Sequence, residues 1–278
     1  MGVHSTAAGA RLRSLVLFGC VICGVLAPEA ARAAEDDPRA ACDETHHLFK
    51  PVPDACLGDI VTDRPHKTDT PAILAAGHAQ AEIGVVEYGF SPKKHDVVTA
   101  WNTQVKLGLH DSLEIGAFYA PVVTSLGAPS STFSRDYAVR AKWLLFQSQD
   151  EAFALTLVPY AEATGRKLTG AGGSLFAGYD FESGLEIELN LGYTAVIGGH
   201  DGSVIATTAL TQPVWGDVGA FLELWTESFV NSTERASTLD IGLLYLVTRD
   251  VQVDGGVYWK LYGDVPLATF FLGTSLRL

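Results

Sequence analysis

Apolar and polar side chains alternate with a period of two from Gly77 to the end of the chain. The run LEIELNLGYTA, residues 185–195, shows the pattern most cleanly, because every second residue is apolar or aromatic and the residues between are polar or glycine. A period of two gives a β-strand one apolar face and one polar face. The region is therefore predicted to form a sheet rather than helices.

Twelve segments can carry this alternation, and each has about ten residues or more. That is roughly twice the length of a strand in a soluble protein and about what a tilted strand needs to cross a bilayer. An even number suits a closed antiparallel barrel. We expect an all-β fold, a transmembrane antiparallel up-and-down β-barrel of about 12 strands over residues 77–278, preceded by an irregular N-terminal leader. The expected strands lie at about 77–90, 97–110, 113–123, 134–147, 152–163, 171–181, 185–198, 203–213, 217–229, 236–247, 251–262 and 267–278.

The connections between these segments alternate in length. Short ones, such as residues 111–112 and 248–250, follow every second segment, and mostly longer ones, such as 124–133 and 164–170, follow the others. Short turns on one rim and longer loops on the other are typical of outer-membrane barrels whose chain ends lie on the periplasmic side. A secreted β-sandwich, the soluble alternative, predicts no such asymmetry.

Charged residues are confined to the polar face of these strands. A basic residue on the lipid face at mid-bilayer costs about 2 to 4 kcal/mol, so this face is predicted to line the lumen. Glu87 breaks the alternation of its segment, and we place it on the outer face near a strand end, where that cost is small. The candidate lumen-lining residues are Glu82, Glu114, Arg140, Lys142, Glu186, Glu188, Glu223, Trp225, Asp240, Asp254, Tyr258 and Lys260.

The first 33 residues have the pattern of a secretory signal peptide. Arg11 and Arg13 precede an apolar core at residues 15–27, and Ala31-Arg32-Ala33 predicts cleavage before Ala34. Cys20 gives the core a faint resemblance to a lipoprotein signal, but cleavage there would leave too short an apolar stretch. The net charge of −13 becomes more negative once the signal is removed, which excludes nucleic acid as a favourable partner.

Residues 34–76 differ from the rest of the chain, because they are rich in proline and show no alternation. We expect an irregular periplasmic leader. Cys42 and Cys56 are predicted to form a disulfide in an oxidising compartment. A metal site that adds His46 and His47 is the alternative, but the spacing matches no usual zinc pattern, and we expect no metal and no cofactor.

Two stretches carry a family resemblance. Residues 60–90, with TDRP at 62–65 and the pattern G-x-x-Q-x-E at 77–82, and the closing residues 253–278 resemble the outer-membrane transporter family associated with the MetA pathway of phenol degradation. The resemblance implies a β-barrel in the outer membrane of a Gram-negative bacterium that admits small organic compounds. It says little about the substrate.

The main functional hypothesis is a passive channel for small organic compounds, aromatic ones included. A lumen of twelve strands should be narrow, so that its lining decides what passes. The acidic residues would discourage anions. Expected partners are outer-membrane lipid and a small organic solute. Inward-facing rings that could stack on aromatic solutes are Phe118, Phe221, Trp225, Tyr258 and Tyr262.

A lumen-filled structural or docking barrel is the alternative. Here the acidic residues would pair with Arg140, Lys142, Lys260 and Arg277, and the leader would be a plug or bind a periplasmic partner. An outer-membrane hydrolase is a third class, but its candidate residues, His110-Asp111-Ser112 and His200-Asp201, fall in turns, where these residue types favour tight bends. We therefore expect no enzyme and assign no catalytic residue.

Overall fold

The computed structural model describes residues 40–92, 94–126, 132–199 and 201–278. The expected signal peptide, residues 1–33, lies outside the described residues, as does His200. Within the described residues, no helix has the length and apolarity needed to cross a bilayer. Two 3-10 helices, η1 (Ala40–Asp43) and η2 (Asp54–Cys56), precede the strands. The strands are β1 (Ala79–Phe90), β2 (Val97–His110), β3 (Leu113–Ser125), β4 (Thr132–Gln147), β5 (Phe153–Thr164), β6 (Lys167–Asp180), β7 (Glu186–Val196), β8 (Gly202–Trp215), β9 (Val218–Val230), β10 (Arg235–Thr248), β11 (Val251–Tyr262) and β12 (Ala268–Arg277).

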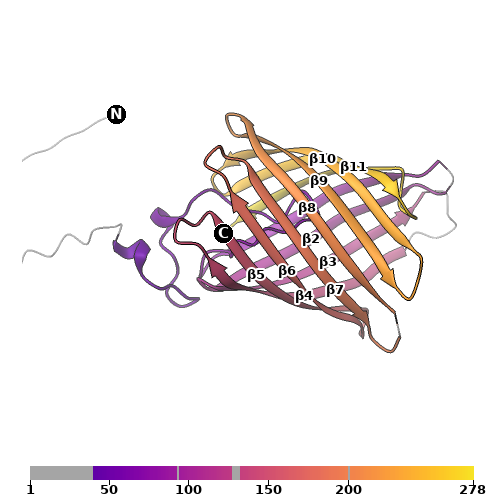
Figure 1. Ribbon diagram of the computed structural model, residues 1–278, viewed down its shortest axis with the longest axis horizontal. Helices are drawn as coiled ribbons and strands as arrows, with labels where there is room; N and C mark the ends of the chain where they lie inside the picture. Colours follow the sequence, from indigo (N-terminus) through magenta and orange to yellow (C-terminus); the bar gives the residue numbers. More distant parts are fainter. Residues whose placement is uncertain (1–39, 93, 127–131, 200) are drawn as a thin grey trace, which may run out of the picture. The chain divides into compact units, whose positions relative to one another are not determined.

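These strands form a closed antiparallel barrel (Figure 1). Each strand pairs with its neighbours in the sequence, and β1 closes the barrel by pairing with β12. The predicted fold class and number of strands are confirmed. We call the end where β1 begins and β12 ends the terminal rim, and the other end the opposite rim.

The expectation of a long loop between the fifth and sixth strands is wrong. Residues 164–170 were expected to connect two strands loosely, but β5 runs to Thr164 and β6 begins at Lys167. These two residues pair with each other, and Gly165 has a φ of 64°, which lets the chain reverse tightly. The contrast between short turns and long loops is weaker than the sequence predicts, because strand pairing continues into residues that carry turn signals.

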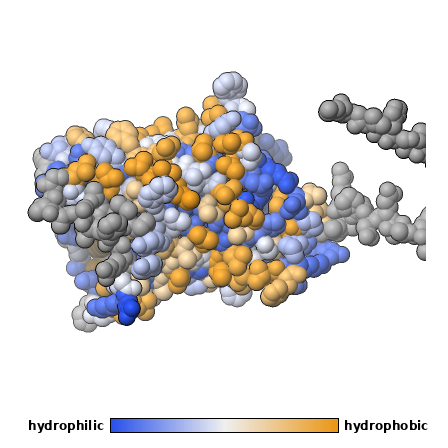
Figure 2. All heavy atoms as spheres, turned by 180° about the vertical axis from the view of Figure 1, so that it is seen from behind, coloured by the Kyte–Doolittle hydropathy of each residue, from blue (hydrophilic) through white to orange (hydrophobic). Residues whose placement is uncertain are grey.

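Many large apolar side chains are exposed on the outer face of the barrel, and Figure 2 shows one side of it. Trp143 and Trp259, for example, leave about half of their surface exposed (55% and 50%). A soluble monomer rarely exposes apolar patches of this extent, whereas lipid chains would cover them at no cost. Other exposed side chains of this face are Val105, Ile115, Val139, Leu191, Leu243 and Phe270.

A β-bulge changes the facing of residues in the second half of β1. Gly84 pairs with Gly273, but the next pair joins Val86 to Leu272, so one residue of β1 has no partner. The side-chain alternation shifts at that point. Val86 faces outward, and Glu87 faces the lumen, where its carboxylate accepts a hydrogen bond from Asn102 Nδ2 at 3.2 Å. The expectation that Glu87 lies on the outer face is therefore wrong.

Candidate functional site

Part of the leader lies inside the barrel. We call residues 61–74 the inserted segment, because their contacts are with inward-facing side chains of the strands. Asp63 and Thr68 have 3% and 0% of their surface exposed. Residues 42–58 lie instead at the terminal rim, where Leu48 N donates to Leu109 O at 2.9 Å. The expected leader, residues 34–76, thus has a rim part and a buried part.

Asp63 binds the positively charged side chains of one wall of the lumen. Its carboxylate accepts hydrogen bonds from Lys106 Nζ at 3.0 Å, Lys142 Nζ at 2.7 Å and Gln104 Nε2 at 2.9 Å. Arg140 binds the same carboxylate and also donates to Asp69 at 2.8 Å. The cations belong to β2 and β4, so the two acidic residues of the inserted segment, together with Glu82 of β1, which also pairs with Lys106, neutralise this wall of the lumen.

The basic residues of the inserted segment face the acidic wall. Arg64 Nη2 lies 2.9 Å from Asp254 of β11, and Lys67 Nζ lies 2.7 Å from Asp240 of β10. His66 Nε2 lies 3.4 Å from Glu188 of β7. The order of charges in TDRPHKTD, residues 62–69, therefore complements a lumen with a positive wall and a negative wall.

The backbone of the inserted segment is also held by side chains of the barrel. Glu82 accepts from the amides of Asp63 and Arg64, at 3.1 and 2.9 Å. Glu223 accepts from the amides of Lys67 and Thr68, at 3.0 and 2.6 Å. Buried amides need such partners, because a segment without secondary structure cannot supply them itself. Further hydrogen bonds join Glu114 to Leu74 N (2.9 Å), Thr156 to Pro71 O (2.6 Å) and Tyr258 to Pro65 O (2.9 Å).

Glycines of the strands make room for the segment. A Cβ on Gly273 would lie 2.2 Å from the guanidinium of Arg64, and a Cβ on Gly108 would lie 2.3 Å from Ala75 O. Both distances are far below van der Waals contact, so a larger residue at Gly108 would displace the backbone of the segment, and one at Gly273 would displace the side chain of Arg64. These inward-facing glycines and the charge run at residues 62–69 were the sequence signals that could have revealed the insertion.

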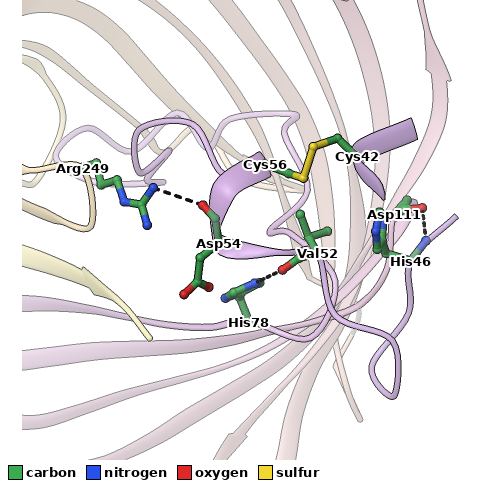
Figure 3. The surroundings of a disulfide bond; sticks show 8 residues. All are labelled: Cys42, His46, Val52, Asp54, Cys56, His78, Asp111 and Arg249. Carbon is green, nitrogen blue, oxygen red and sulfur yellow. Dashed lines mark hydrogen bonds and ion pairs between the residues drawn. A yellow bond between two sulfur atoms is a disulfide. The ribbon is translucent and has the colours of Figure 1, made fainter. Parts of the chain in front are cut away.

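The rim part of the leader is attached to the barrel around a disulfide (Figure 3). Cys42 and Cys56 are bonded, with sulfur atoms 2.00 Å apart. Nearby, Arg249 donates to Asp54 O at 3.1 Å, and His46 N donates to Asp111 at 2.7 Å. Among residues 40–92, 94–126, 132–199 and 201–278, no three His, Cys, Asp or Glu side chains gather as a metal site would require.

Arg277 also strengthens the terminal rim. Its guanidinium donates to Asp250 in the turn between β10 and β11 and to Gly58 O at 2.7 Å. The hydrogen bond from Arg277 lowers the pKa of Asp250, and the nearby positive charges of Arg277 and Arg249 act in the same direction. The rim thus binds the leader just before it enters the barrel.

Most of the candidate lumen-lining residues contact the inserted segment. Trp225 lies under Lys67 Nζ, 4.9 Å from its ring centroid. Glu186 borders cavities near the terminal rim, and Lys260 lies nearer the opposite rim. Those in contact through hydrogen bonds or ion pairs are Glu82, Glu114, Arg140, Lys142, Glu188, Glu223, Asp240, Asp254 and Tyr258.

The inserted segment separates cavities at the two ends of the lumen. On the side of the opposite rim lies a cavity of about 290 Å³, bordered by Lys67 and Asp69; we call it the outer cavity. On the side of the terminal rim, cavities of about 290 and 250 Å³ are bordered by residues 59–62 and 70–73 respectively, and Glu186 and Glu188 line both. A solute crossing the lumen would meet the inserted segment between them.

Comparisons with known proteins agree with the barrel. The structure of the KdgM porin matches with a TM-score of 0.52 at 9% identity, covering 71% of this chain and 98% of that chain. The NanC porin structure matches with a TM-score of 0.53 at 12% identity, covering 71% of this chain and all of that chain (100%). At such identities the likeness shows the fold. No curated protein matches the sequence.

A family described as "Putative MetA-pathway of phenol degradation" matches residues 62–278. The match covers most of the chain and confirms the resemblance seen in the sequence. It begins at Thr62, so the matched region includes nearly all of the inserted segment as well as the twelve strands.

Proposed function

This chain belongs to the family of the MetA pathway of phenol degradation, and we propose on that basis that it is an outer-membrane channel for passive uptake of small organic compounds, aromatic ones included. One observation carries the proposal. A barrel with an apolar outer face encloses a polar lumen that holds cavities on both sides of the inserted segment. Membrane lipid would cover the outer face, and the lumen offers polar surfaces to a solute.

We infer that the inserted segment acts as a plug that must move before a solute can cross. Its ion pairs reach both walls of the lumen, and its backbone is bound by Glu82 and Glu223. A segment that only tethered the leader would need no such contacts. The leader would remain attached by its rim part, through Cys42–Cys56 and the bond from Arg249, while the inserted segment shifts.

Movement of the inserted segment would leave a lumen with opposite charges on its two walls. Lys142 would face Glu223 and Asp240 across the open space, while Lys106 would keep its ion pair with Glu82 of β1. Such a lumen orients dipoles and provides hydrogen-bond partners, so it favours polar uncharged solutes over ions of either sign. The cavities beside the inserted segment, of about 250 to 290 Å³, suit compounds of one ring.

A structural barrel with a permanently filled lumen is the second candidate. It is favoured by the depth at which Asp63 is buried among its three cations. A hydrolase receives less support. His110 Nδ1 lies 3.0 Å from Ser112 Oγ, but both residues flank the turn between β2 and β3, and Asp111 is already bound to His46 N. These contacts suit a turn that anchors the leader.

Solute flux into lipid vesicles distinguishes a channel from a barrel whose lumen is permanently filled. The full-length protein, refolded and checked for heat-modifiable migration, should make vesicles permeable to phenol-sized neutral solutes and not to a trisaccharide. A variant in which a short Gly-Ser linker replaces residues 61–74 should pass the same solutes faster. If neither protein passes any solute although both barrels are inserted, the channel proposal is wrong.

A further inference from the structure

The side chain of Lys67 occupies a pocket of the barrel that has the composition of an ammonium-binding site. Its Nζ donates to Thr238 Oγ1 at 2.8 Å and to Asp240 Oδ2 at 2.7 Å. The same atom lies 3.9 Å from the ring centroid of Tyr258 and 4.9 Å from that of Trp225. The N–H groups of a protonated amine donate hydrogen bonds, and its charge is attracted to aromatic rings. We call these four barrel residues the aromatic pocket.

The aromatic pocket belongs entirely to the barrel wall. Its residues lie on the adjacent strands β9, β10 and β11, where Thr238 pairs with Trp225 and Asp240 pairs with Tyr258. Phe271 of β12 stacks on the ring of Tyr258, with the two centroids 4.5 Å apart. Side chains placed by paired strands hold their positions more precisely than side chains on irregular segments. The pocket therefore does not depend on the inserted segment for its shape.

The wall around the aromatic pocket carries more negative charge than Lys67 neutralises. Asp240 and Glu223 are direct cross-strand partners, and both are fully buried. Glu223 accepts hydrogen bonds from two backbone amides and one hydroxyl group of the inserted segment, none of which is charged. In the described part of the chain, Lys67 is the only cation that forms an ion pair with either carboxylate. The pocket is therefore suited to a cation and disfavours an anion.

The outer cavity gives access to the aromatic pocket when the side chain of Lys67 withdraws. This side chain is 29% exposed and borders the cavity, whose volume is about 290 Å³. Glu162 also lines the cavity and offers a carboxylate to the displaced ammonium group of Lys67. A primary ammonium group that enters makes the contacts that Lys67 gives up, so the exchange leaves no buried carboxylate without a cation.

We propose that Thr238, Asp240, Trp225 and Tyr258 bind the primary ammonium group of a small organic cation, which competes with Lys67 for the aromatic pocket. The ligand acts on the inserted segment, because the ion pair from Lys67 is one of the contacts that hold this segment to the negative wall. It is distinct from the uncharged solutes proposed to cross the lumen. Its effect on the segment rests on the proposed function, whereas its binding does not.

The probe for the aromatic pocket is n-butylammonium, because it is the side chain of Lys67 without its backbone. Its binding is measured by isothermal titration against the full-length protein in detergent. We expect saturable binding that is at least about tenfold tighter to Lys67→Ala than to the unaltered protein, since Lys67 occupies the pocket of the unaltered protein most of the time. The uncharged 1-butanol should show no saturable binding.

Two further substitutions, each made in the Lys67→Ala protein, locate the bound ammonium group. Thr238→Val keeps the shape of the side chain but removes a hydrogen-bond acceptor, and should weaken n-butylammonium binding about tenfold. Trp225→Leu removes one aromatic face and should weaken binding about threefold. Thr211→Val is the matched control, because Thr211 borders the cavity on the terminal-rim side, and it should leave the affinity unchanged. Heat-modifiable migration checks that each barrel is folded.

The flux of phenol-sized neutral solutes into vesicles measures the effect of the ligand on the inserted segment. We expect n-butylammonium to raise this flux through the unaltered protein and to leave it unchanged through Lys67→Ala, in which the contact is already lost. Binding to the unaltered protein without a rise in its flux would overturn the effect on the segment.

Two results would overturn the site itself. One is an absence of saturable n-butylammonium binding to Lys67→Ala, and the other is equal affinity in the Thr238→Val, Trp225→Leu and control proteins. Binding to Lys67→Ala alone, with none to the unaltered protein, would show that the aromatic pocket serves only Lys67 and would overturn the ligand. If no inserted barrel passes any solute, the channel proposal fails, while calorimetry still decides on the site.

Discussion

Neutralising Asp63 is the sharpest test of the charge arrangement in the lumen. In the Asp63→Asn variant, the side chain keeps its size but loses the charge that meets Lys106, Arg140 and Lys142. Lys142 is fully buried, and its other hydrogen bond goes to Ala72 O at 3.2 Å. The substitution therefore leaves a buried cation without its carboxylate.

The free-energy cost of this substitution follows from the burial of the ion pair. Removing one partner of a buried ion pair costs about 3 to 5 kcal/mol, because the remaining charge stays desolvated. Asparagine can still accept one hydrogen bond, so we expect a cost of about 3 kcal/mol. Since 1.4 kcal/mol is a factor of ten, the ratio of displaced to inserted segment should rise roughly 100-fold.

Single-channel recording of the full-length protein in planar bilayers measures this ratio as the fraction of time in the conducting state. Glu44→Gln is the matched control, because Glu44 is an acidic residue of the same leader whose partner, Lys50, is exposed at the rim. The control should behave like the unaltered protein. Equal open fractions for Asp63→Asn and the control, in barrels that are fully inserted, would refute the reasoning.

Three further predictions concern the inserted segment, the disulfide and the ion pair between Lys94 and Asp264. Gly108→Val should displace the end of the inserted segment and raise vesicle permeability, because a Cβ at Gly108 would lie 2.5 Å from Leu74 O, whereas Gly116→Ala, with its nearest contact at 3.5 Å, should not. Replacing both Cys42 and Cys56 with serine should remove about 3 kcal/mol of loop-closure stabilisation, seen as faster proteolysis of residues 42–58 with no change in the heat-modifiable migration of the barrel. The pKa of Asp264 is lowered by its hydrogen bond and ion pair with Lys94, so this contact between Lys94 and Asp264 is present at neutral pH and is lost as the pH falls through that lowered pKa. Amide exchange in residues 263–267 should therefore accelerate in acid, and Asp264→Asn should exchange faster at neutral pH as well; identical exchange in the two proteins at neutral pH would contradict the prediction.

The barrel could be predicted from the sequence because lipid imposes a simple rule on every strand. Residues such as Trp143 and Leu191 must face outward and residues such as Glu188 inward, and that rule repeats every two residues. The disposition of Glu87 could not be predicted, because one unpaired residue in β1 shifts the alternation without any change in composition.

The sequence left open whether the leader is a plug or a tether, for a different reason. The residues of the inserted segment have no periodicity, and their partners are spread over strands far apart in the sequence, from Glu82 to Asp254. Opposite charges on the lumen face suggested pairing among the strands themselves. Arg140 and Lys142 instead pair with Asp63 and Asp69, so the lumen is neutralised by a piece of chain that composition alone identifies as a leader.

The position of Arg64 has a consequence for assembly. Its guanidinium contacts Asp254 of β11 and fills the space left by Gly273 of β12, while its own backbone is bound by Glu82 of β1. The seam where the barrel closes joins β1 to β12, the first strand to be synthesised and the last. Residues of both strands of that seam therefore contact Arg64, which is synthesised before either strand. Closure of the barrel is thereby coupled to threading of the leader, and a chain that closed without the leader inside would leave Lys142 without Asp63 and the carboxylate of Glu223 without the amides that it binds.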